Sequence, residues 1–381
     1  MNLPLPRSAG AIASFILAIV SLSAVRAQDP SIDRLLKKLP PPEKLVKPTV
    51  ERAASQPDPA LRDPLGSQIV SAAQANDAGR ALDLSRKLSA KYPKSAGSEC
   101  LHGIVALSFR QYGEAAPAFR RAIALSPNFS LAHFGLAATE VFQDHYAAAI
   151  PPLKELTRLE PQYGFGWLAL SDCALRCGRK QESLEYARRA TKVAPSSASA
   201  WMQLARAENA AGSAEAALQA LTRGAEVSPD SSEMLATVGF AYINLNRIAQ
   251  AIPPLQRAAR LTPRDFLVQT QLGFCLQATG QLDAGIEHLR KGANLAPKTY
   301  GAVWEHLGLA YQKKGMHSEA VKAFERATQI MPNYGPAWRH LADEYRALGK
   351  VAEATRAEAR ARSSPGGKTG PKSKSLRRGA S

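Results

Sequence analysis

Residues 304–332 read WEHLGLAYQKKGMHSEAVKAFERATQIMP, and this stretch decides how the chain folds. Small and bulky apolar side chains stand at fixed places in it, and Pro332 ends it. A proline does not continue a helix, because it lacks an N–H group and its ring clashes with the preceding turn. We therefore expect a helix to end at Pro332, and the rest of the chain repeats the same pattern.

Prolines recur at a fixed interval along most of the chain. Neighbouring prolines of this series are 34 residues apart six times and 35 residues apart once, with the extra residue in 298–301. The series is Pro93, Pro127, Pro161, Pro195, Pro229, Pro263, Pro297 and Pro332. Each proline is expected to mark the end of the second helix of a repeated unit.

Other positions repeat in step with the prolines. Eight residues before a proline the side chain is mostly bulky, as in Phe119 and Leu255. Five residues before it the side chain is mostly small, as in Ala327, and earlier in the repeat a bulky residue precedes a small one, as in Leu307–Gly308. Small residues let two helices approach closely, and large ones fill the space between repeats. The pattern predicts repeated helices that lie side by side.

The stretch 304–332 resembles the tetratricopeptide repeat, a helix–turn–helix unit of about 34 residues. The residues that carry the resemblance are Trp304, Leu307, Gly308, Tyr311, Gly315, Ala320, Phe324, Ala327 and Pro332. The resemblance implies an all-α fold, a right-handed α-solenoid of about eight repeats over residues 96–362 that forms one continuous unit. A degenerate helix pair at 61–95 is expected to cap it at one end. Glu358 replaces an apolar residue and is expected to mark the other cap.

Residues 1–27 have the features of a secretory signal peptide. Arg7 precedes an apolar run from Ala9 to Val25, and Val25 and Ala27 are small residues at the positions that a signal peptidase recognises. We expect cleavage after Ala27 and export to the periplasm or the exterior of the cell. The alternative is an uncleaved membrane anchor, because an apolar run of 17 residues is at the short end of what spans a bilayer.

Two further segments differ in composition from the repeats. Residues 28–60 are rich in proline and are expected to form an extended spacer. Residues 363–381 contain lysine and arginine but no acidic residue, and we expect a disordered tail. This tail carries five of the positive charges behind the net charge of +17. It could contact a membrane or an acidic cell-wall polymer, or it could simply be solvated. No nucleic-acid partner is expected outside the cytoplasm.

The resemblance implies that first helices line a concave groove and second helices form the outside. First-helix residues that do not pack against a neighbouring helix are then expected to face the groove. In repeats 2–6 these positions are apolar, aromatic or amide, which is typical of a protein-binding strip. The candidate peptide-binding residues are Leu131, Phe134, Phe142, Phe165, Met202, Arg206, Asn209, Phe240, Asn244, Phe274 and Gln277. The alternative is that the neighbouring helix or the spacer covers these aromatic residues.

No residue pattern predicts catalysis, a cofactor or a metal. His306 and His340 occupy the same position in adjacent repeats, and we interpret them as polar surface in preference to a metal or acid–base site. Cys100, Cys173, Cys177 and Cys275 are interpreted as buried free thiols, although an exported protein can form disulfides. A bond between Cys173 and Cys177 would have poor geometry, because they lie one turn apart on the same helix. The sequence does not decide whether these two are free thiols.

The residues of the carboxylate clamp found in some members of the family do not occur at the matching positions. The leading hypothesis is an exported scaffold that binds a protein or peptide segment without catalysis. The alternative is a structural subunit of a cell-envelope or secretion assembly that uses the convex face and the basic tail. The sequence does not fix the partner or the oligomeric state.

Overall fold

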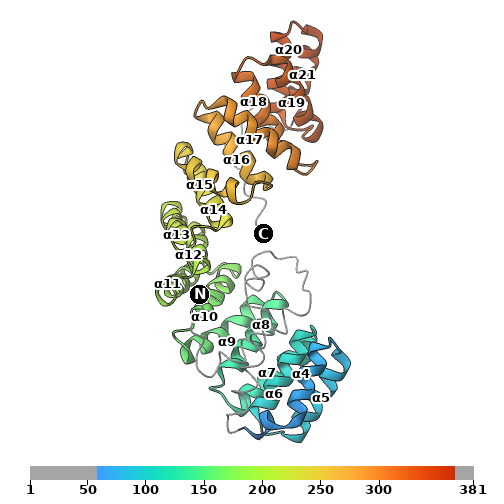
Figure 1. The fold of residues 1–381 in the computed structure, drawn as a ribbon, viewed down its shortest axis with the longest axis vertical. Helices are drawn as coiled ribbons and strands as arrows, with labels where there is room; N and C mark the ends of the chain where they lie inside the picture. The colour runs from blue at the N-terminus through green and yellow to red at the C-terminus, as the bar shows by residue number, and fades with distance from the viewer. Residues whose placement is uncertain (1–57, 365–381) are drawn as a thin grey trace. The chain divides into compact units, whose positions relative to one another are not determined.

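The computed structural model describes residues 58–364, and over this range it is helical without any strand (Figure 1). A short 3-10 helix, η1 (Pro59–Arg62), comes first. The α-helices that follow are α4 (Pro64–Gln74), α5 (Ala78–Lys91), α6 (Ala96–Ser108), α7 (Tyr112–Leu125), α8 (Ser130–Phe142), α9 (Tyr146–Leu159), α10 (Gly164–Arg176), α11 (Lys180–Val193), α12 (Ala198–Ala210), α13 (Ala214–Val227), α14 (Ser232–Asn244), α15 (Ile248–Leu261), α16 (Phe266–Ala278), α17 (Leu282–Leu295), α18 (Ala302–Lys313), α19 (His317–Ile330), α20 (Gly335–Ala347) and α21 (Val351–Ser363). None of these described helices has the length and hydropathy of a membrane span.

The helices form consecutive antiparallel pairs, and the predicted all-α solenoid fold is confirmed (Figure 1). The pair α4 and α5 precedes eight repeats, which begin with α6 and α7 and end with α20 and α21. The signal peptide, nearly all of the spacer and the basic tail were predicted for segments that lie outside the described residues.

The chain separates into two compact units, one ending at Ala220 and the other beginning at Leu221. The boundary falls inside α13, the second helix of the fourth repeat. These two parts are here called unit 1 and unit 2, and each is described by itself. Unit 1 is built around a core that includes Phe119, and unit 2 has cores around Leu255 and Phe324.

The alternation of small and large residues works as the sequence predicted. A Cβ atom added to Gly308 would lie 2.6 Å from the ring of Phe324, and one added to Gly239 would lie 2.5 Å from Leu255. In each repeat concerned, the bulky side chain of the second helix therefore rests directly on the backbone of the first. Phe119 makes this contact twice, because Gly103 of its own repeat and Gly135 of the next repeat both lie against its ring.

A left-handed backbone conformation joins the first helix of every repeat to the second. Gly315 has a φ of 73°, which explains why a glycine follows the first helix in the stretch that resembles the family. The other seven repeats place Arg110, Asp144, Gly178, Gly212, Asn246, Gly280 and Gly349 at this point, all with positive φ. The turn is thus the same in all eight repeats, although its residue is not.

Hydrogen bonds hold the proline carbonyls that end most repeats. The indole Nε1 of Trp201 donates to the oxygen of Pro195 at 2.7 Å, and those of Trp167 and Trp338 donate to Pro161 and Pro332 at 2.9 Å. His133 and Gln269 stand at the same place in their repeats, and their side chains bond Pro127 and Pro263. Leu235 cannot donate there, and Arg257 of the second helix donates to Pro229 in its stead. In five repeats the fourth residue of the first helix thus fixes the loop that precedes it.

Candidate peptide-binding surface

First helices form the inner layer of each unit. In unit 1, α6 contacts α8 and α10 contacts α12, and in unit 2, α14, α16, α18 and α20 contact one another in succession. Among the described residues, no second helix has comparable contact with the second helix of the next repeat. The first helices therefore lie closer together than the second helices, which is the arrangement that the family resemblance implied.

Two of the predicted groove residues in unit 1 are not accessible. Phe134 is 7% exposed, and Leu131 is 1% exposed. The ring of Phe134 lies 5.9 Å from that of Phe165 and 6.4 Å from that of Tyr163, both from the next repeat. The prediction that Leu131 and Phe134 face the groove is wrong, because both are buried, Phe134 by the aromatic rings of the following repeat.

The other predicted residues of unit 1 remain accessible on the inner layer. Phe142, Phe165 and Met202 are half-buried, and Arg206 and Asn209 are exposed. Phe142 stacks on Tyr112 with the ring centroids 6.5 Å apart. The rings of Phe142 and Phe165 are therefore held in place by aromatic neighbours while part of their surface stays open.

Beside these apolar residues lies a polar cluster that links Arg206 of the candidate set with Asp172, Arg176 and Gln203, which the set did not include. The carboxylate of Asp172 accepts hydrogen bonds from Arg176 Nε at 2.8 Å and from Arg206 Nη1 at 3.2 Å. Arg176 also donates to the hydroxyl of Tyr146, and Arg206 donates to Gln203. Asp172 is buried, so it fixes both guanidinium groups and neutralises only one of their charges. Asp172 and Arg206 occupy the same position in successive repeats, which explains why their side chains meet.

Unit 2 presents a similar but smaller surface. Phe240 and Phe274 are half-buried, and Asn244 is exposed. Gln277 is 4% exposed and is not the groove amide that was predicted. A Cβ on Gly285 would lie 3.0 Å from the backbone nitrogen of Gln277, so α17 approaches α16 closely at this residue. The small residue that permits this approach is the physical reason why Gln277 is covered.

The two histidines of unit 2 pack on separate aromatic rings. The ring of His306 lies 5.0 Å from that of Phe274, and the ring of His340 lies 5.4 Å from that of Phe324. Burial lowers the pKa of His306 to about 4, and it also lowers the pKa of His340. Both imidazoles are therefore neutral at pH 7. No group of three potential metal ligands occurs within residues 58–364.

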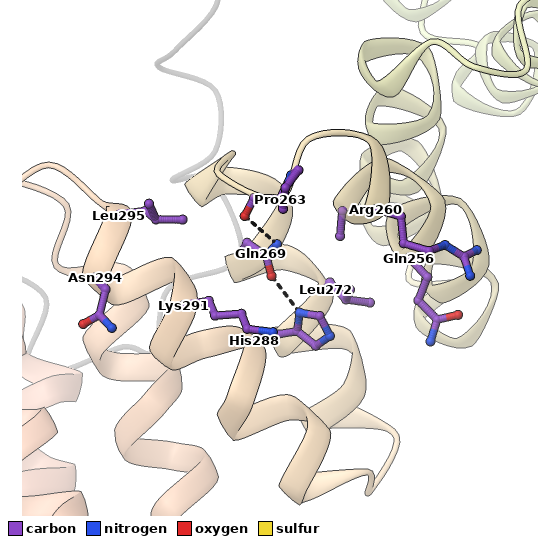
Figure 2. A pocket seen from close by; sticks show the side chains of 10 residues that line it. Gln256, Arg260, Pro263, Gln269, Leu272, His288, Lys291, Asn294 and Leu295 are labelled. Atoms are coloured by element: carbon purple, nitrogen blue, oxygen red, sulfur yellow. Dashed lines mark hydrogen bonds between the residues drawn. The ribbon is translucent and has the colours of Figure 1, made fainter.

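A cavity on the outer side of unit 2 is the feature that sequence reasoning missed. It lies between α15 and α17 above α16, and Gln269, His288 and Lys291 line one side of it (Figure 2). Gln269 stands where repeats 3, 4, 7 and 8 have tryptophan, but the groove of repeat 8 that contains Trp338 is of similar size, about 810 Å³ against about 760 Å³. The residue at this position therefore does not signal the cavity.

Comparison with known proteins identifies the family. Tetratricopeptide repeat models match residues 100–164, 144–294 and 301–334. The chain therefore belongs to the tetratricopeptide repeat family, as the sequence resemblance indicated. No protein with curated annotation matches the sequence.

Solved structures of similar fold share little sequence with this chain. The C-terminal part of a TPR repeat-containing protein from Cytophaga hutchinsonii is 12% identical, with a TM-score of 0.54 over 64% of this chain and 99% of its own length. YrrB, described as a TPR protein with an unusual peptide-binding site, is 17% identical, with a TM-score of 0.45 over 49% and 95%. PilW, described as a type IV pilus biogenesis factor, is 19% identical, with a TM-score of 0.44 over 52% and 92%. At these identities the likeness shows the fold alone.

Proposed function

We propose that this chain is a scaffold without catalytic activity that holds a segment of a partner protein against the first helices of unit 1. The observation that carries this proposal is the combination of Phe142, Phe165 and Met202, all half-buried, with the immobilised guanidinium of Arg206. Aromatic and arginine side chains that are held in place before binding are the usual energetic centres of protein interfaces. The bound segment buries apolar surface, at about 25 cal/mol per Å².

The polar cluster supplies hydrogen-bond donors that would orient a segment bound on the apolar surface. Arg206 uses only Nη1 in its hydrogen bonds to Asp172 and Gln203, and no described residue accepts from its other N–H groups. These donors and the exposed amide of Asn209 suit the carbonyl groups of a peptide backbone. A partner segment would then place apolar side chains against Phe165 and Met202 and its backbone beside Arg206.

The site of action is a second part of the proposal. The sequence of residues 1–27 supports export, so the folded repeats would act in the periplasm or outside the cell. The basic residues of 363–381 support contact with a membrane or an acidic polymer of the cell wall. Deleting 363–381 from the full chain should then release it from the envelope fraction, and unchanged fractionation would contradict the tail contact.

A crosslinking experiment tests the proposed surface. The full-length protein, expressed in its own host, would carry a photo-crosslinking amino acid at Met202 or, as the control, at Leu261. Leu261 is 44% exposed and ends a second helix, so it lies away from the inner layer. We expect one partner to crosslink through Met202 and not through Leu261.

Substitutions then measure what the surface contributes. Met202→Glu should weaken capture of that partner by at least about tenfold, which corresponds to 1.4 kcal/mol, because it places a charge among apolar contacts. Leu261→Glu should leave capture unchanged. Equal crosslinking from both positions, or full capture by the Met202→Glu protein, would refute the proposed surface.

A further inference from the structure

A short amphipathic pattern occurs in the segment that precedes the described residues. Residues 31–39 read SIDRLLKKL. The apolar side chains among them are Ile32, Leu35, Leu36 and Leu39. These positions, i, i+3, i+4 and i+7, share one face of an α-helix, and the proline that follows at position 40 would end such a helix. The spacing is that of a helix that binds a groove through its apolar face.

The chain joins the array at one edge of the inner layer of unit 1. Asp58, the first described residue, accepts hydrogen bonds from the hydroxyl of Ser95 at 2.6 Å and from the backbone N–H of Gly97 at 3.2 Å. Both donors lie where α6, the first helix of repeat 1, begins. Because each repeat is an antiparallel pair, the first helices all run in the same direction (Figure 1). Asp58 therefore lies at the edge of the layer at which α10 and α12 also begin.

The chain between the pattern and Asp58 is long enough to reach these helices. It consists of residues 40–57, which are 18 residues. Such a length spans about 25 Å on average as a flexible chain and about 55 Å as an extended proline-rich one. Packed helices lie about 8–10 Å apart, so α10 and α12, two and three first helices beyond α6, are about 16–30 Å away. A tether that matches the span gives the segment a high effective concentration at this surface.

The surface at this edge complements the amphipathic segment. Phe165 lies in the first turn of α10 and Met202 in the second turn of α12, and both are half-buried. Arg206 lies one turn beyond Met202 and has donors left over, because it uses only Nη1 in its bonds to Asp172 and Gln203. The two arginines and one aspartate of this cluster leave a net positive charge beside the apolar side chains.

The segment has one acidic residue, and it borders the apolar face. At about 100° per residue, Asp33 lies about 60° from Leu36 on a helix. A helix that sets Leu36 against Met202 would therefore hold the carboxylate of Asp33 near Arg206. A carboxylate suits the parallel N–H groups of a guanidinium.

We infer that residues 31–39 bind in the same chain as a short helix on the inner layer of unit 1. Leu35 and Leu36 contact Phe165 and Met202, and Asp33 accepts from Arg206. The inference rests on the function proposed above and adds the regulation of that surface. A partner has to displace the tethered segment, so its measured affinity is lower than its affinity for the open surface.

Photo-crosslinking in the purified full-length protein tests the inference without any partner. A photo-crosslinking amino acid at Met202 should join residues 31–39, as identified by mass spectrometry of the peptides, and the same amino acid at Leu261 should not. A mixture of ordinary and isotope-labelled protein shows whether the two ends belong to one chain. Products that link two chains would overturn the assignment to the same chain, and the absence of a product with 31–39 would overturn the inference.

A labelled peptide measures the contact independently. The probe is a fluorescein-labelled peptide of residues 29–41. The protein with Leu35→Glu and Leu36→Glu loses its competing segment while every described residue is unchanged, so it should bind the probe saturably. The wild type should bind the probe at least about tenfold more weakly. Lys37→Gln, on the polar face, is the matched control and should behave as the wild type does. Equal binding by the wild type and the double variant would overturn the inference.

Further substitutions locate the bound peptide. In the double variant, Met202→Glu should weaken probe binding at least about tenfold, because it places a charge among apolar contacts, and Leu261→Glu should not. Unchanged binding by the Met202→Glu protein would place the peptide elsewhere and overturn the inference. A probe with Asp33→Asn should bind about threefold more weakly, as expected for one exposed ion pair, and equal binding would overturn the contact with Arg206.

The outcomes separate this inference from the proposed function. If a partner crosslinks through Met202 in the host while residues 31–39 do not in the purified protein, only the inference about the segment is wrong. If neither crosslinks through Met202, the inner-layer surface is wrong as well.

Discussion

Replacing Gly135 by alanine tests the contact on which the first two repeats of unit 1 depend. The new Cβ atom would lie 2.2 Å from the ring of Phe119, whereas non-bonded carbon atoms rest about 3.5–4.0 Å apart. The ring has little room to withdraw, because Phe119 is 0% exposed and Gly103 also lies against the same Cδ1, Cε1 and Cζ atoms of the ring. Overpacking of this kind costs about 1–3 kcal/mol, and the gain in helix propensity from glycine to alanine is about 0.5–1 kcal/mol. We therefore expect a net loss of about 1 kcal/mol.

Gly113→Ala is the matched control for this prediction. Gly113 also lies in a helix, and a Cβ atom added there would meet nothing within 4 Å. It should stabilise the protein by about 0.5 kcal/mol through the unfolded state. Urea denaturation followed by circular dichroism gives both values, and hydrogen exchange of residues 96–142 shows whether the loss is local, since repeats open in parts.

A second substitution decides whether the ring is the cause. Adding Phe119→Leu to Gly135→Ala removes the atoms that overlap, so the two substitutions together should destabilise by less than the sum of the two separate effects. If Gly135→Ala stabilises the protein as Gly113→Ala does, or if the two effects simply add, the ring of Phe119 is not held as described.

Three further results are expected. Trp201→Phe should cost about 1 kcal/mol in urea denaturation, because it removes the hydrogen bond to the carbonyl of Pro195, and an unchanged midpoint would contradict that bond. Burial lowers the pKa of His306 from 6.5 to about 4 in the folded protein. Between these two pH values the unfolded chain binds more protons than the folded chain. The free energy of unfolding should therefore fall as the pH falls from 6.5 to 4. The contribution is about 3 kcal/mol, and His306→Phe should flatten that part of the pH profile; an equal slope in both proteins would refute it. Cys177 is half-buried while the other three cysteines are buried, so iodoacetamide should modify Cys177 first in the native protein, and mass spectrometry of the peptides would show any other order.

The sequence predicted those parts of the fold that depend on the 34-residue period. The prolines gave the ends of the second helices, and the small and large positions gave contacts such as that between Gly308 and Phe324. The division at Ala220 could not be predicted, because the period continues through it to Pro229 without a break. The repeated residues are those with which each helix packs against its neighbours. These neighbours are the same kinds of helix before and after Ala220, so the repeat does not mark the division.

The candidate surface was predicted less completely, for a related reason. Helical periodicity tells which face of α8 carries Phe134, but the residues that cover this face, Tyr163 and Phe165, come about 30 residues later. Gln277 was misplaced for the same reason, since its cover depends on how closely Gly285 lets α17 approach. The exposure of residues such as Arg206 and Asn244 was easier to predict, because it does not depend on a helix that comes later in the chain.

A residue of the next repeat holds the carbonyl of the proline that ends a repeat. The 34-residue sequence repeat and the structural unit that is held together therefore have different boundaries. A fragment cut directly after Pro195 keeps the acceptor and loses Trp201, the residue that holds it. Shortening or lengthening this protein by whole repeats should therefore be done with junctions beyond the first turn of the next helix, so that each loop travels with its own donor. Where such a bond is present, it ties the end of one hairpin to the start of the next, so the two ends of a shortened array are not equivalent.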